Sequence, residues 1–441
     1  MTLSLLYPVA TLAWIANIVG ARARAQGWRV SPSTGAFLIG AVAVVIAIQM
    51  VRRRVPSRPA TLLRYACWIP LVYLTLFYDN HSLVPRVPLL LTLAVCATAD
   101  TATGAFAGPF LLTTTLLGLI VIVDAAWRAP TPAVLLEKHP PRYWQPDPAL
   151  GYRPLVDTDV SITCWRKSRR VYQVSCTFDE FGRRRTPDDP EDRPVAHAIF
   201  MGNSCVFGEN VADDQTLPSH FAAQTTGFAV YNYGFIGWGP QQMLALLQSG
   251  QLRAQVPQRS GLLLYGLLPD HVRRVNGSYT ATAWGGRFPR YVLRDGDPVH
   301  AGSFADSQPR RIAWFNLLRS SPALDYVARR IDDAWGYTPS RWRMLLEVVR
   351  RSKVEYERRF DGSFVVFIWP FGGRHAIALA DSLTSRGIRV LDLAAIGVPS
   401  PQPNQLVPYD AHPAGAYYAT VAEALRAADP LGQHHVTDET L

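Results

Sequence analysis

Lysine is almost absent from this 441-residue sequence: Lys138, Lys167 and Lys353 are the only three, and every other basic side chain is an arginine. The formal net charge is +10. No basic helix with interleaved aromatic residues accompanies that charge, which argues against a nucleic-acid partner. Metal-ligand patterns are lacking as well, because the tail pair His434 and His435 has no third ligand at metal spacing. We therefore expect no metal site and no cofactor.

Long apolar runs, by contrast, fill the first third of the chain. Four of the five runs are long enough, or nearly so, for a membrane-spanning helix of about 20 residues. The run 87–99 is short and ends at Asp100, so it could cross, re-enter or lie in the interface. The first run lacks the basic segment that opens a signal peptide. We expect a transmembrane region of four to five helices over residues 1–127, from the runs 2–20, 34–51, 61–78, 87–99 and 109–126.

The orientation of these spans follows from the charge of the short loops. The loop "VRRRVPSRPATLLR" is the most basic, whereas arginines at 22, 24 and 29 partly oppose it. With that basic loop in the cytoplasm and five crossings, everything after Trp127 lies outside, which in a bacterium is the periplasm. Four crossings would leave it in the cytoplasm. We expect five, hence a multi-pass protein of the inner membrane with membrane lipid as a partner.

Residues 128–195 are rich in proline and arginine and predict an extended juxtamembrane linker, followed by a β-hairpin in "DVSITCWRKSRRVYQVSCTF". Cys164 and Cys176 fall at corresponding places on its arms. They are expected either to form a disulfide, if this region is outside, or to remain two thiols. The arginines at 183–185 precede the acidic stretch "DDPED", which predicts a solvated turn.

From residue 196 onward, strand-like apolar runs alternate with helical patterns. This alternation predicts an α/β domain with a parallel sheet between two layers of helices, in which sites form at the carboxyl ends of strands. Ser204 comes directly after the first run. The expected strands are "AHAIFMG", "FAVYNYG", "GLLLYGLL", "SFVVFIWPF" and "IRVLDL", and the expected helices lie near 214–225, 240–250, 373–386 and 415–427. We place this domain at 196–430 and a tail at 431–441.

An insertion over residues 273–362 separates the third and fourth strands. It predicts a hairpin with an Asp-Gly turn, followed by two or three amphipathic helices. Such insertions commonly shape the substrate site at the carboxyl end of a sheet. Trp284, Arg287 and Tyr291 would suit a sugar or an anionic substrate, although a lid without ligand contacts is equally compatible with the pattern.

Three sequence blocks, in order, resemble those of the SGNH hydrolases, the GDSL-type lipases and esterases. The first block, "GNSCVFGENVADDQT", supplies Ser204, with Gly202, Asn203, Gly208, Asp214 and Thr216 around it. The second, "YNYGFIGWG", supplies Asn232, Gly234 and Gly237. The last, "YDAHPAG", supplies Asp410 and His412. The resemblance covers residues 196–428 and implies a flavodoxin-like three-layer α/β/α fold preceded by the transmembrane region.

The resemblance implies a Ser-His-Asp triad. Ser204 would be the nucleophile, His412 the base, and Asp410 the residue that orients the histidine. The backbone N–H groups of Ser204 and Gly237 would form the oxyanion hole. Cys205, beside the serine, is the weaker candidate for a nucleophile.

The sequence departs from the family pattern at three points. Asn203 replaces the usual Asp, and Asp-x-His replaces the commoner Asp-x-x-His. The Asn expected after the third strand is missing from "YGLLPDHVRR". We expect His271 to serve as the third oxyanion donor in its place, because Asp270 could only accept a hydrogen bond when ionised.

The function indicated is a membrane-anchored serine esterase that cleaves an acyl ester, with acetyl as the expected acyl group. Its substrate would be an acylated small molecule, lipid or glycan. One alternative is an O-acyltransferase that acts on a cell-surface polysaccharide or a lipid-linked glycan, with a membrane acyltransferase as a further partner. Another is a non-catalytic glycan-binding subunit on the same fold.

Overall fold

The computed structural model describes residues 136–428, apart from 141, 167, 188–193 and 373. The predicted transmembrane region and the tail lie outside these residues. Within the described part, no helix is both long and apolar enough to cross a membrane. Residues Trp314–Ala328 group apart from the unit that carries the sheet, which comprises Ala133–Ala313 and Arg329–Leu441.

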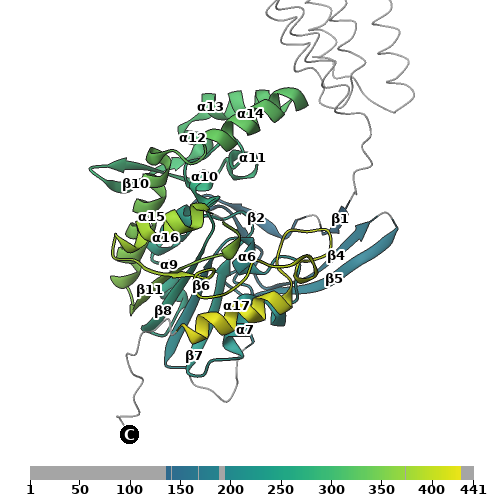
Figure 1. The fold of residues 1–441 in the computed structure, drawn as a ribbon, viewed down its shortest axis with the longest axis vertical. Coiled ribbons are helices and arrows are strands. Elements are labelled where there is room, and N and C mark those ends of the chain that lie inside the picture. The colour runs from purple at the N-terminus through teal and green to yellow at the C-terminus, as the bar shows by residue number, and fades with distance from the viewer. Residues whose placement is uncertain (1–135, 141, 167, 188–193, 373, 429–441) are drawn as a thin grey trace, which may run out of the picture. The chain divides into compact units, whose positions relative to one another are not determined.

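A parallel sheet of five strands forms the centre of this unit (Figure 1), in the order β12-β11-β8-β6-β7. Each of the five strands predicted from the apolar runs is present. They are β6 (Ala196–Gly202), β7 (Phe228–Gly234), β8 (Ser260–Leu267), β11 (Asp361–Ile368) and β12 (Arg389–Asp392). Every residue of β6 is buried, as expected for a parallel strand covered on both faces.

Helices cover both faces of the sheet because successive strand residues point to opposite sides. Phe200 packs in one core cluster with residues of α7 (Leu217–Ala222) and α17 (Gly415–Ala427). Its neighbour Ile199 belongs to the other cluster, with residues of α8 (Pro240–Ser249), α15 (Pro339–Glu357) and α16 (Arg374–Thr384). The short helix α9 (Gln251–Gln255) follows α8. The predicted three-layer α/β/α arrangement is therefore observed.

The region before the sheet contains more strands than the sequence analysis predicted. The hairpin β4 (Thr158–Arg166) and β5 (Arg169–Phe178) is present, and β1 (Leu136–His139) pairs with β4. A second antiparallel pair, β2 (Trp144–Asp147) and β3 (Gly151–Pro154), lies in the stretch expected to be an extended linker. Proline-rich composition hid these strands, which are only four residues long.

Cys164 and Cys176 do not face each other across the hairpin. Cys164 pairs with Tyr172 and Cys176 pairs with Val160, and both thiols are free and buried. The prediction that they occupy corresponding places was wrong, because the register of the hairpin offsets them along the strands.

The insertion contains the predicted hairpin, β9 (Pro289–Arg294) and β10 (Asp297–Ser303), and positive φ angles of 51° at Asp295 and 89° at Gly296 form its turn. Its helices are α10 (His271–Val275), α11 (Thr282–Gly285), α12 (Phe304–Ser307), α13 (Pro309–Arg319), α14 (Pro322–Trp335) and α15. Helix α15 packs beside α8 on one face of the sheet.

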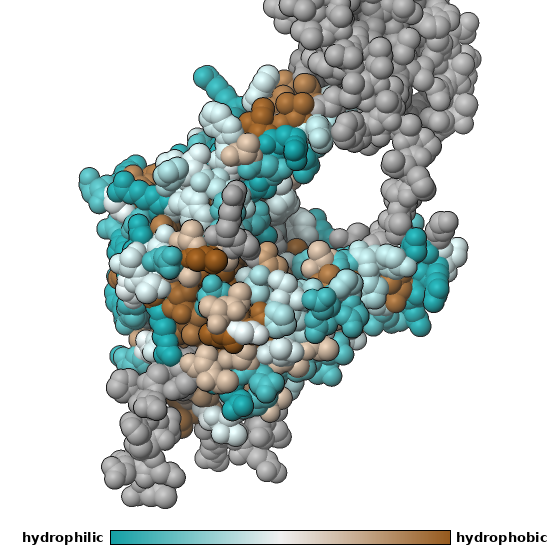
Figure 2. All heavy atoms as spheres, viewed as in Figure 1, coloured by the Kyte–Doolittle hydropathy of each residue, from teal (hydrophilic) through white to brown (hydrophobic). Residues whose placement is uncertain are grey.

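Helix α14 exposes apolar side chains, and Figure 2 shows a few hydrophobic residues among hydrophilic ones in this region. Ile331 and Trp335 are 57% and 67% exposed. Asp332, between them in sequence, is buried and accepts a hydrogen bond from the backbone N–H of Thr280 at 3.0 Å. The helix thus turns one carboxylate inward, while apolar side chains share its exposed face with charged ones such as Arg330 and Asp333.

Candidate functional site

Ser204 lies at the sharp turn from β6 into the short helix α6 (Ser204–Phe207). Asn203 begins that helix, and its Oδ1 accepts a hydrogen bond from the backbone N–H of Cys205 at 3.1 Å. Gly202 leaves no room for a side chain, since a Cβ there would lie 2.6 Å from Val206 Cγ2. The cap at position 203 uses only a side-chain oxygen, which asparagine supplies as well as aspartate does.

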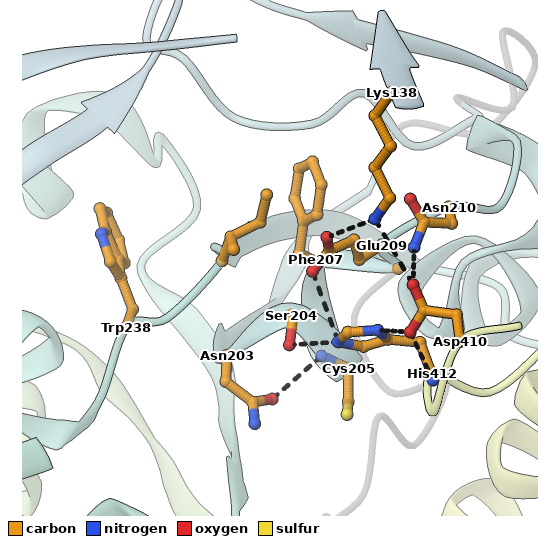
Figure 3. A network of polar contacts seen from close by, with 12 residues as sticks. Lys138, Asn203, Ser204, Cys205, Phe207, Glu209, Asn210, Trp238, Asp410 and His412 are labelled. Atoms are coloured by element: carbon orange, nitrogen blue, oxygen red, sulfur yellow. Dashed lines mark hydrogen bonds and ion pairs between the residues drawn. The ribbon is translucent and has the colours of Figure 1, made fainter. Parts of the chain in front are cut away.

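His412 and Asp410 reach Ser204 from the loop before α17, more than 200 residues along the chain (Figure 3). The Ser204 hydroxyl donates to His412 Nε2 at 2.8 Å, and His412 Nδ1 donates to Asp410 Oδ1 at 2.5 Å. The structure thus brings the three predicted residues into one continuous chain of hydrogen bonds.

The tight Asp-x-His spacing has a local explanation. The backbone N–H of His412 also donates to Asp410 Oδ1, at 3.1 Å. Tyr409, just before, has a positive φ of 61°, and the N–H of Asp410 bonds to the carbonyl of Val407. This turn folds the carboxylate back onto its own histidine, so a single intervening residue is sufficient.

Three polar residues that the sequence analysis did not select complete the network. Asn210 Nδ2 donates to Asp410 Oδ2 at 2.7 Å, and Lys138 Nζ lies 3.4 Å from the same oxygen. Lys138 also lies 3.4 Å from Glu209 Oε1, and Glu209 Oε2 lies 3.4 Å from His412 Nε2. Asp410 is thus held from both sides, and a second carboxylate faces the histidine nitrogen that bonds Ser204.

These contacts shift the pKa values of the pair. Burial alone would lower the pKa of His412, but the Asp410 hydrogen bond and the nearby charge of Glu209 outweigh it and raise the pKa above the ordinary histidine value. Burial would raise the pKa of Asp410, yet its bonds to His412 and the charge of Lys138 hold that pKa well below the usual range. Asp410 is therefore a carboxylate wherever His412 can act as a base.

Cys205 points away from this network and is 6% exposed. Burial raises the pKa of its thiol to about 12. A thiol that stays protonated is a poor nucleophile, and it is the hydroxyl of Ser204 that bonds the histidine.

The second sequence block supports the serine turn from behind. Asn232 Nδ2 donates to the carbonyls of Val206 and Phe207, both at 3.3 Å, and its Oδ1 accepts from the N–H of Gly234. Gly234 lies so close to the turn that a Cβ would meet Phe207 N at 2.6 Å. Asn232 and Gly234 therefore fix the position of α6.

Gly237 follows with a φ of +70°. A Cβ at this position would lie 2.5 Å from the Tyr152 hydroxyl and 2.8 Å from Trp284 Nε1. Trp284, from the insertion, is 44% exposed. Of the other insertion residues singled out from the sequence, Tyr291 is buried and bonds Gln248, so it is not available to a ligand, whereas Arg287 is exposed.

His271 is fully buried at the start of α10. Its Nδ1 lies 2.9 Å from the Tyr265 hydroxyl, and its Nε2 has no hydrogen-bond partner among the described residues. Burial, reinforced by the charge of Arg274, lowers the pKa of His271 well below its ordinary value, so the ring is neutral. It makes no hydrogen bond to Ser204, and its role as an oxyanion donor stays a prediction.

Arg184 is the clearest correction to the sequence analysis, which expected a solvated turn. Its side chain is 1% exposed. It donates to Asp213 Oδ1 at 2.7 Å and to the carbonyls of Gly208 and Val211 at 2.5 and 2.6 Å, with longer bonds to those of Phe207 and Ser175. The buried guanidinium thus fixes the backbone from Gly208 to Val211, which carries Glu209 and Asn210.

Thr216, another residue of the first block, caps a helix. Thr216 accepts a hydrogen bond from the N–H of Ser219 and begins α7. In the neighbouring acidic pair it is Asp213, not Asp214, that makes the ion pair with Arg184. No group of three or more His, Cys, Asp or Glu side chains in the described part is arranged to hold a metal ion.

Comparison with known proteins finds similarity in structure only. No family model and no curated protein matches the chain. TesA is similar over 53% of this chain and 99% of its own, at 12% identity and a TM-score of 0.30. A lipolytic protein of the G-D-S-L family from Veillonella parvula gives 13% identity and a TM-score of 0.30, over 53% of this chain and 98% of its own. A catalytic mutant of Axe2, an acetylxylan esterase from Geobacillus stearothermophilus, gives 12% identity and a TM-score of 0.32, over 53% of this chain and 94% of its own. Similarity at this level does not assign an activity, so the function proposed next rests on the contacts around Ser204.

Proposed function

We propose that the chain is a serine esterase that cleaves an acyl ester through Ser204, His412 and Asp410. The observation that carries the proposal is the continuous hydrogen-bond chain from the Ser204 hydroxyl through both nitrogens of His412 to the partly buried carboxylate of Asp410. A serine that merely capped a helix would need neither the histidine nor the aspartate.

In the first half of the reaction, the Ser204 oxygen attacks the ester carbonyl while His412 Nε2 takes its proton. Asp410 stabilises the imidazolium through Nδ1. The C–O bond to the leaving alcohol then breaks, and His412 returns the proton to that alcohol. Water attacks the acyl-enzyme in the second half, and the acid is released.

Negative charge on the carbonyl oxygen needs hydrogen-bond donors. The N–H of Ser204, at the first position of α6, has no acceptor within its own helix, and the N–H of Gly237 is the expected second donor. We keep His271 as the third. If Tyr265 donates to Nδ1, then Nε2 carries the ring proton and is an unspent donor.

Of the alternatives, an O-acyltransferase would share the acyl-enzyme and differ only in its acceptor. A non-catalytic subunit would not need a serine whose hydroxyl is hydrogen-bonded to a histidine base. We further propose that the apolar runs at 1–127 anchor the enzyme in the inner membrane, with the described domain in the periplasm.

The proposal is tested with a fluorophosphonate probe, which labels only an activated serine. The full chain in detergent should be labelled at Ser204 and should release acid from p-nitrophenyl acetate. Ser204→Ala should lose both properties, whereas Cys205→Ala should keep them. Labelling that survives in Ser204→Ala, or an unlabelled wild-type protein, would contradict the assignment. Acid release with and without an added glycan separates hydrolase from transferase.

A further inference from the structure

Glu209 is a second carboxylate beside the histidine, and the reaction outlined above does not use it. Its side chain is 13% exposed, and its Oε2 lies 3.4 Å from His412 Nε2. Figure 3 shows it on the same side of the imidazole as Ser204. The carboxylate therefore borders the position where a nucleophile must approach Nε2 to be deprotonated.

Neither Glu209 Oε2 nor His412 Nε2 carries a hydrogen that it could donate to the other. When His412 Nδ1 donates to Asp410, the neutral ring presents only a lone pair at Nε2, and a carboxylate oxygen likewise presents only lone pairs. In the resting site the Ser204 hydroxyl donates to Nε2. Once Ser204 is acylated, this donor is gone, and two acceptor atoms face each other at 3.4 Å.

Lys138 holds the Glu209 side chain in place. Its Nζ lies 3.4 Å from Glu209 Oε1 and 3.4 Å from Asp410 Oδ2, between the two carboxylates. The other Glu209 oxygen, Oε2, is left facing the histidine. An ion pair that is two-thirds or more shielded from solvent fixes a side chain better than an exposed pair does.

A water molecule satisfies both acceptors at once. It has two O–H groups, and hydrogen bonds of about 2.8 Å to each acceptor are compatible with atoms 3.4 Å apart. An alcohol has a single O–H. If that hydrogen goes to Nε2, the carbon of the alcohol is turned toward Glu209 Oε2, to which it cannot donate.

On the basis of the proposed esterase function, we propose that Glu209 positions the hydrolytic water and thereby selects water over alcohols as the acyl acceptor. In this step one O–H of the water donates to Glu209 Oε2 and the other to His412 Nε2. The water oxygen forms a bond to the acyl carbon as its proton passes to Nε2. The bond from that carbon to Ser204 Oγ then breaks, and His412 returns the proton to Ser204.

The partition of one acyl-enzyme between two acceptors tests this inference. The full chain in detergent turns over p-nitrophenyl acetate in the presence of methanol, and the ratio of methyl acetate to acetate is measured by NMR. Glu209→Leu, which removes the acceptor, should raise that ratio about tenfold, because a hydrogen bond to a charged group is lost only from the water pathway. Glu209→Gln, which keeps a neutral amide oxygen, should raise it less. Glu423→Gln, an exposed carboxylate on α17, should not change it.

The ratio counts only molecules that form an acyl-enzyme, so partial misfolding leaves it unchanged. A general loss of basicity at His412 would slow both pathways and leave the ratio unchanged as well. A wild-type ratio in both Glu209 variants overturns the inference while the esterase proposal stands. If the wild-type protein yields neither product and is not labelled at Ser204, the esterase proposal itself fails.

Discussion

Replacing Arg184 by methionine should lower the free energy of unfolding of the domain. This buried side chain bonds several groups of the loop after Ser204. The methionine would keep much of the apolar volume but none of the donors. It would leave Asp213 without its cation, although the N–H of Thr177 still donates to it, and would remove the guanidinium from the Gly208 and Val211 carbonyls, which it bonds at 2.5 and 2.6 Å. Removing a donor from a buried polar group costs about 1–3 kcal/mol, and several acceptors lose one here, so we take about 4 kcal/mol for the loss.

Buried thiols provide the assay. Cys176 and Cys205 are 1% and 6% exposed, and burial raises the pKa of each to about 12, so they react with an alkylating reagent only after opening. A loss of about 4 kcal/mol should accelerate their alkylation roughly a thousandfold. Mass spectrometry of the two peptides separates them from those of Cys67, Cys96 and Cys164.

Arg185→Met is the matched control, because Arg185 is exposed and its backbone bond to Thr177 survives the change. It should alter the alkylation rate less than threefold, by the usual small effect of surface substitutions. An acceleration below tenfold in Arg184→Met would refute the view that this guanidinium holds the loop.

Further predictions concern the site and the topology. Because the pKa of His412 is raised and the base must be neutral, activity should rise with pH through a midpoint above about 6.5, and a midpoint below that value would contradict the assignment. Lys138→Met should move this midpoint upward, since the lysine charge lowers the pKa of His412; a pH–rate profile checks both. His271→Ala should cost roughly a hundredfold in kcat and His271→Asn much less, if His271 is the third oxyanion donor; a wild-type rate in the alanine variant would exclude it. Alkaline phosphatase fused after Arg128 should be active, whereas activity of a cytoplasm-only reporter there would indicate four crossings.

The fold of the α/β domain was predictable because its strands are buried on both faces. Such strands appear as short apolar runs between glycines and helical patterns, and Ala196–Gly202 and Phe228–Gly234 match their predicted bounds. Ser204, Asp410 and His412 were found because each lies in a short block of characteristic residues, at the end of a predicted strand or before a predicted helix. Their hydrogen bonds could then be anticipated.

The rest of the network could not be predicted, because its contacts join residues that share no pattern. Lys138 meets Asp410 across 272 positions, from a strand only four residues long. Arg184 was expected to be solvated, since an acidic stretch follows it. Its partners are instead Asp213 and backbone carbonyls, which every residue possesses and no sequence pattern marks. Tertiary packing, not local composition, decided which arginine of the run became buried.

The charge network around His412 also sets when activity can arise during synthesis. Lys138 belongs to β1, shortly after the apolar third, whereas Asp410 and His412 come from the loop before the last described helix. A growing chain that has completed its apolar segments and the Ser204 turn still lacks the base and its orienting acid. The proposed hydrolytic activity therefore requires nearly the whole domain to have been made. A chain that stops before residue 410 would carry a serine without its base.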